Sequence, residues 1–152
     1  MTTAAHPQKN KVITASELRA QMAELEAEKQ ALLESRRAKA EGSMRDVAEE
    51  FTRGHLSREE LDEVRKKIRH AVDHGMFEVM VMRFPSSLCT DKGRAINNAL
   101  PNWPDTLPLK AHELYGAWER LAKPAGYHLR AYIIDFPNGM PGDVGLFLNW
   151  AA

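Results

Sequence analysis

The alternation of apolar and polar side chains is clearest in the segment FEVMVMRF, residues 77–84. Apolar residues occupy both faces of this stretch, and only Glu78 and Arg83 interrupt them. A strand that is apolar on both faces is usually covered on both faces. Because Pro85 cannot donate a hydrogen bond to a neighbouring strand, the pattern predicts a buried strand that ends there.

Two more stretches near the end of the sequence have the periodicity of strands. Residues 127–136 alternate, and residues 144–150 place four apolar side chains on one face. The seven-residue loop 137–143 between them holds two Pro, two Gly and one Asn. This composition predicts that the two stretches pair as antiparallel strands. The connection from 77–84 to 127–136 is long enough for a parallel crossover, so we expect a three-stranded mixed sheet.

Helical periodicity marks the first half of the chain. Residues 13–42 are predicted to form a polar amphipathic helix, capped by Thr14 with a Glu three residues later. Gly42 interrupts the pattern, so residues 43–75 are predicted to form a separate helical hairpin with its turn at Gly54.

Two further helices are predicted between the first and second strands, over 91–100 and 106–123. Residues 1–12 are polar and aperiodic, which predicts a disordered tail. The predicted fold class is therefore α+β (mixed α/β). It has an N-terminal helical extension and a helical hairpin, followed over 76–152 by a small domain with the element order β-α-α-β-β.

The helix over 13–42 carries a heptad seam on an otherwise charged surface. The seam consists of Leu18, Met22, Leu25 and Leu32. Lys29 and Arg36 take the neighbouring seam positions, so the apolar run is a short coiled coil at most. A helix this polar buries little by itself, so the pattern predicts a homo-oligomer, most simply a dimer.

The turn after the first strand is the best candidate for a ligand site. Its hydroxyl groups and cations converge on a predicted helix N-terminus, whose free N–H groups attract anions. These residues are Ser86, Ser87, Thr90, Lys92 and Arg94. Asp91 counts against the site because its carboxylate competes for the same N–H groups. The glycine spacing of phosphate loops and dinucleotide-binding motifs is absent.

The charge balance narrows the classes of partner. The 152 residues include 21 basic and 21 acidic side chains, and this neutrality argues against nucleic-acid binding. A helix-turn-helix over 43–74 nevertheless stays an alternative for DNA binding. The single Cys89 fits a reducing compartment, and no apolar run approaches the length of a membrane span. These features predict a cytoplasmic protein that does not bind membranes.

The sequence contains no recognisable catalytic constellation, cofactor motif or metal site. Cys89 would be a nucleophile only beside a His, and Asp135 and Asp143 would act as acid and base only if they were paired. His70 and His74 have the i, i+4 spacing of metal ligands, but no further ligand accompanies them at a recognisable spacing.

The sequence thus favours a non-enzymatic regulatory or scaffolding module for protein–protein interaction that acts as a homo-oligomer. The second hypothesis is a small-molecule or anion-binding domain that uses the turn at 86–94. DNA binding through 43–74 and an enzyme that uses Cys89 rank below these two.

Overall fold

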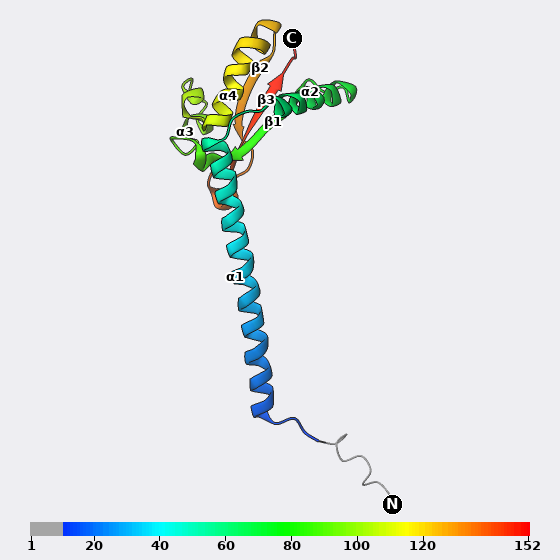
Figure 1. Ribbon diagram of the computed structural model, residues 1–152, viewed down its shortest axis with the longest axis vertical. Coiled ribbons are helices and arrows are strands. Elements are labelled where there is room, and N and C mark those ends of the chain that lie inside the picture. The colour runs from blue at the N-terminus through cyan, green and yellow to red at the C-terminus, as the bar shows by residue number, and fades with distance from the viewer. Residues whose placement is uncertain (1–10) are drawn as a thin grey trace, which may run out of the picture. The chain divides into compact units, whose positions relative to one another are not determined.

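The computed structural model describes residues 11–152, so the predicted disordered tail over 1–12 lies almost entirely outside the described residues. The chain divides into two units, residues 1–44 and residues 45–152. Helix α1 (Ala15–Arg53) is the regular structure of the described part of the first unit (Figure 1). Its last turns, from residue 45 on, belong to the second unit. None of the described helices is both long enough and apolar enough to cross a lipid bilayer.

Helix α1 begins where the sequence predicts. The Thr14 hydroxyl accepts a hydrogen bond from the Glu17 N–H at 3.1 Å, and the Glu17 carboxylate accepts one from the Thr14 N–H at 3.2 Å. The predicted break at Gly42 is wrong, because α1 continues to Arg53. One Gly in a helix costs only about 1 kcal/mol relative to Ala, and the surrounding Ala, Glu, Lys and Arg residues favour helix. Residues 43–53 therefore belong to the same helix as residues 15–42, and helix α2 (Arg58–Asp73) follows them after a short turn at Gly54.

The sheet of the second unit contains β1 (Glu78–Pro85), β2 (His128–Ile133) and β3 (Asp143–Asn149) in the spatial order β1-β3-β2. The predicted antiparallel pairing of the last two strands is confirmed. The predicted mixed sheet is wrong, because β3 pairs with both neighbours in the antiparallel direction. After the hairpin turn, β3 inserts between β1 and β2, so these two strands are never adjacent. β1 is consequently an edge strand, half-buried along most of its length.

The core lies between one face of this sheet and the helices. Four helical segments contribute side chains to it: the end of α1, helix α2, helix α3 (Arg94–Asn97) and helix α4 (Leu109–Ala117). The buried apolar cluster contains Phe51, Val81, Phe84, Cys89, Ile96, Leu107, Ala111, Leu114, Leu129, Val144, Leu146 and Leu148. The α+β class and the N-terminal helices predicted from the sequence are thus confirmed.

Two predicted helices are shorter than expected. The helix predicted over 91–100 is reduced to the four residues of α3, because Lys92 and Gly93 adopt left-handed backbone angles just before it. The helix predicted over 106–123 begins only at Leu109. It changes after α4 into a π-helical turn over Trp118–Ala122, followed by a 3-10 turn that contains Pro124. A proline offers no N–H to the preceding turn, which accounts for the irregular end.

Candidate functional site

The turn predicted as a ligand site is largely satisfied by the chain itself. Ser86 is buried, and its hydroxyl donates a hydrogen bond to the Pro141 carbonyl at 3.2 Å. The two Asp91 carboxylate oxygens accept hydrogen bonds from the Gly93 and Ala95 N–H groups at 2.9 and 2.8 Å. The remaining predicted residues are exposed: Ser87, Thr90, Lys92 and Arg94. Asp91 thus holds the N–H groups that an anion would need, and ligand binding at this turn stays a prediction.

Cys89 lies in the same segment, but it faces the core. Only 4% of its surface is exposed. Burial, together with the negative charge of Asp91, raises the pKa of the Cys89 thiol to about 11. The thiolate is the nucleophilic form, so this cysteine is almost entirely unreactive at neutral pH.

The carboxylates of Asp135 and Asp143 are brought together around a cation. Arg83 Nε donates a hydrogen bond to Asp143 Oδ2 at 2.7 Å, and Arg83 Nη2 lies 3.6 Å from Asp135 Oδ2. Asp135 Oδ1 also accepts a hydrogen bond from the Asp143 N–H at 2.7 Å. These contacts close the loop between β2 and β3, which gives both carboxylates a structural role.

The rings of His70 and His74 lie against each other at the end of α2, tilted by 39°, with their centroids 4.2 Å apart. His74 Nδ1 lies 2.8 Å from the carbonyl oxygen of His70 and so serves the end of the helix. Across residues 11–152, no group of three or more His, Cys, Asp or Glu side chains is placed to hold a metal ion.

An ion cluster around the buried Lys110 was not predicted from the sequence. Its ammonium group donates to Glu50 Oε1 at 2.8 Å and to Glu60 Oε2 at 2.9 Å, and it lies 5.7 Å from the centre of the Phe51 ring. Burial opposes the charge, but the two carboxylates outweigh it and raise the pKa of Lys110. The cluster ties the end of α1 and the start of α2 to the start of α4. Its members are 50 and 60 positions from Lys110, so no local pattern indicated it.

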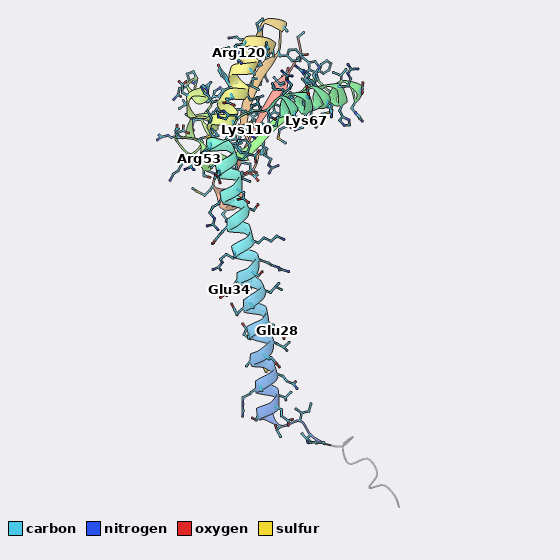
Figure 2. The ribbon with its side chains drawn as sticks, viewed as in Figure 1. Glu28, Glu34, Arg53, Lys67, Lys110 and Arg120 are labelled. Carbon is cyan, nitrogen blue, oxygen red and sulfur yellow. The ribbon has the colours of Figure 1, made fainter. Side chains whose placement is uncertain are left out.

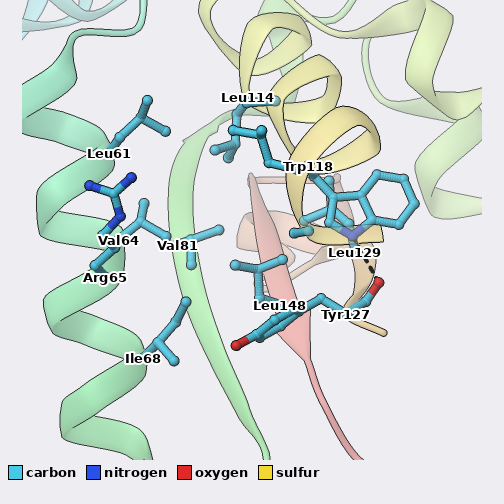
Figure 3. Close-up of a pocket in the computed structure, with 13 residues that line it drawn as sticks. Leu61, Val64, Arg65, Ile68, Val81, Leu114, Trp118, Tyr127, Leu129 and Leu148 are labelled. Atoms are coloured by element: carbon cyan, nitrogen blue, oxygen red, sulfur yellow. Dashed lines mark hydrogen bonds between the residues drawn. The ribbon is translucent and has the colours of Figure 1, made fainter. Parts of the chain in front are cut away.

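An apolar groove of about 230 Å³ lies between α2 and the helical segment that begins with α4 (Figure 3). One wall is formed by α2 and the other by α4 and the π-helical turn, and the strands form the floor. The apolar side chains that Figure 3 labels around it are Leu61, Val64, Ile68, Val81, Leu114, Trp118, Leu129 and Leu148. Trp118 Nε1 donates a hydrogen bond to the Tyr127 carbonyl at 3.0 Å, which fixes the indole ring in the wall.

The rim of this groove is unusual in two respects. The π-helical turn contributes Trp118, Leu121 and Ala122 to the lining, and π-helical turns recur at functional sites. Leu121 is 69% exposed, a high value for a leucine beside an apolar surface. Arg65 at the rim forms an ion pair with Asp62 at 2.7 Å. The groove was not predicted from the sequence, because its walls come from separate helices and residues 106–123 were expected to form one regular helix. Pro124 was the one local signal of an irregular end near it.

The predicted seam on α1 is exposed within the first unit. Leu18, Met22, Leu25 and Leu32 are 46%, 68%, 65% and 52% exposed, respectively. Every neighbouring residue from 15 to 41 is exposed as well. The described part of this unit therefore contains no packing partner for the seam.

No protein-family model, curated protein or solved structure matches this chain. The function must therefore be argued from the geometry of its own residues.

Proposed function

We propose that this protein is a non-enzymatic protein–protein interaction module that acts as a homo-oligomer assembled through the first part of α1. The observation that carries the proposal is the exposed seam of four large apolar side chains on that helix. Such a row on a charged helix is typical of a surface that another helix covers.

The energetics support this assignment. Fully burying one Leu or Met side chain contributes about 1.5–3 kcal/mol. Helices in proteins gain most of their stability from packing an apolar face. A partner helix would supply this packing to residues 15–44, whereas the charged outer face stays in water.

The ion pairs and the buried thiol of the second unit also favour binding over catalysis. Lys110 and Arg83 each join separate elements of the fold through carboxylates, and the Cys89 thiol is buried with a raised pKa. These groups are accounted for by folding, so binding is better supported than catalysis as the function of the chain.

The test is a comparison of association states by sedimentation. The full chain should sediment as an oligomer at micromolar concentration, and Leu25→Gln in the seam should weaken association. Ala27→Gln, on the outer face of the same helix, is the matched control and should leave it unchanged. A full chain that stays monomeric at high micromolar concentration would overturn the proposal.

The apolar groove supports a second candidate function, the binding of an apolar small molecule. Its lining of fixed apolar side chains and its π-helical wall favour this reading. The probe 1-anilinonaphthalene-8-sulfonate should bind with saturable fluorescence, and Leu121→Arg should remove that binding. Leu109→Arg, at a partly exposed position of α4 outside the groove lining, is the control. Equal binding by both variants would exclude the groove as the binding site.

A further inference from the structure

The first part of α1 is neutral overall, but its charges are segregated along the helix. Residues 15–28 contain four Glu and one Arg, a net charge of −3. Residues 29–40 contain four basic residues and one Glu, a net charge of +3. Because the whole stretch is helical and exposed, the two halves form an acidic and a basic segment of one rod.

The composition of the seam changes at the same point. Leu18, Leu25 and Leu32 occupy one heptad position, conventionally d, and Met22, Lys29 and Arg36 occupy the other, a. The seam positions are entirely apolar in the acidic segment, and in the basic segment they include three cations, Lys29, Arg36 and Lys39.

We propose that α1 pairs with α1 of a second copy in the antiparallel direction, with the pair centred near residue 27. This inference rests on the proposed function, because it specifies the partner of the seam. Antiparallel pairing places the acidic segment of each copy beside the basic segment of the other. Parallel pairing in register would place acidic beside acidic and basic beside basic, which is unfavourable for charges at close range.

The seam residues lead to the same orientation. In an antiparallel pair, a residue at a packs in one layer with a residue at d of the other helix. Met22 then meets Leu32 of the second copy, and Arg36 meets Leu18 of the second copy. The long stem of Arg36 can cover that leucine while its guanidinium reaches water.

Lys29 shows the contrast most clearly. In the antiparallel pair, Lys29 packs with Leu25 of the second copy, and Glu26 and Glu28 of the second copy flank it. In a parallel pair it would meet its own equivalent across the seam, and so would Arg36. Lys39, at the next d position, would do the same, so the antiparallel arrangement avoids three layers of like charge.

Disulfide cross-linking distinguishes the two orientations. A chain with Leu18→Cys, mixed with a chain with Arg36→Cys, should form a cross-linked heterodimer on mild oxidation. Either variant alone should cross-link at a much lower yield. The pair Met22→Cys and Leu32→Cys should behave in the same way and serves as a second, independent layer. The unsubstituted chain is the background control, since its Cys89 is buried.

Sedimentation of the same samples separates this inference from the proposed function. Dimers in which Leu18→Cys cross-links to itself would show parallel pairing and overturn the antiparallel proposal alone. Dimers with no preference for the mixed pairs would also overturn it. A monomeric parent chain would overturn the proposed function as well.

A charge reversal provides a separate readout. Glu28 flanks the seam and Glu34 lies on the outer face of the helix; the side chains of both extend from it in Figure 2. Lys29→Glu should weaken self-association about tenfold, because it places a carboxylate beside Glu26 and Glu28 of the second copy. Glu34→Lys changes the net charge by the same magnitude on the outer face and should have a much smaller effect. Equal effects of the two variants would contradict a paired acidic segment.

Discussion

At the scale of single residues, Lys110 joins the end of α1 and the start of α2 to the start of α4. Its ammonium group is buried, whereas the carboxylates of Glu50 and Glu60 remain 54% and 38% exposed. Removal of the cation would leave two carboxylates that water can still reach. We therefore expect a smaller loss than the 3–5 kcal/mol typical of breaking a fully buried pair.

Lys110→Met should lower the free energy of unfolding by about 1–3 kcal/mol. The methionine keeps much of the apolar stem, so the change isolates the charge. Lys66→Met is the matched control, because the ion pair of Lys66 with Glu63 is exposed and should contribute less than about 0.5 kcal/mol. Urea unfolding of the three proteins measures both values, and equal losses would show that the cluster around Lys110 has no special role.

The effect of Lys110→Met should depend on pH. The pKa of Glu60 is lowered in the fold: burial opposes its charge, but the hydrogen bonds from Lys110 and Ser57 outweigh that effect. Its stabilisation is therefore present above the unfolded value of about 4.3 and is lost as the pH falls through the folded value. The raised pKa of Lys110 means that its contribution is present below about 10.4 and is lost above that value. The difference between parent and variant should be constant from about pH 5 to 10 and shrink on both sides.

Cys89 offers a second test at this scale. Its raised pKa and its burial predict that iodoacetamide modifies the folded protein very slowly at pH 7 and rapidly in denaturant. The rate in the native state should follow the rate of opening of the core. Rapid modification of the native protein would place the thiol at the surface and restore it as a candidate nucleophile.

At the scale of elements, the signals for the starts of α1 and α2 and for the hairpin were reliable, the signals for helix ends were less so, and contacts between distant segments could not be predicted. The capping box that starts at Thr14 depends on residues three positions apart and forms as expected, and Ser57 forms a second one of the same spacing with Glu60. The hairpin of β2 and β3 was also predicted, from the Pro, Gly and Asn residues of its loop. The position of β3 between β1 and β2 depends on packing between distant segments, so the order of strands could not be derived. The groove was not predicted from the sequence for the same reason, because its walls come from separate helices.

Gly42 shows why one residue rarely ends a helix. An added Cβ at this position would meet nothing within 4 Å, so Gly42→Ala should stabilise this part of α1 by about 0.5–1 kcal/mol. Hydrogen exchange of the amides around residue 42 should slow about two- to fivefold as a result. Gly54→Ala is the contrasting variant, since its Cβ would clash with the Glu50 carbonyl and should be destabilising. Similar responses at both positions would contradict the difference in their surroundings.

At the scale of the whole molecule, the boundary of the folded unit differs from the boundary that the hydrophobic pattern indicates. The pattern places most of the core within 76–152, beginning at the first strand. The structure adds Phe51 to that core, with its ring centroid 5.4 Å from that of Phe84. The two carboxylates that bind Lys110, those of Glu50 and Glu60, also lie before residue 76. Residues 45–75 are therefore part of the core and not an accessory to it.

The last prediction compares two truncated chains. Residues 45–152 keep the end of α1, all of α2 and the ion cluster, so this fragment should unfold cooperatively and remain monomeric. Residues 76–152 would expose Phe84, the floor of the groove and an unpaired Lys110. We expect this shorter fragment to aggregate or to lose fixed tertiary structure, seen as a weak near-ultraviolet circular dichroism signal. If 76–152 proved soluble, monomeric and as stable to urea as 45–152, the role given to α1 and α2 in the core would be wrong. If 45–152 associated as strongly as the full chain, assembly would instead depend on the folded unit, and the seam of α1 would need another partner.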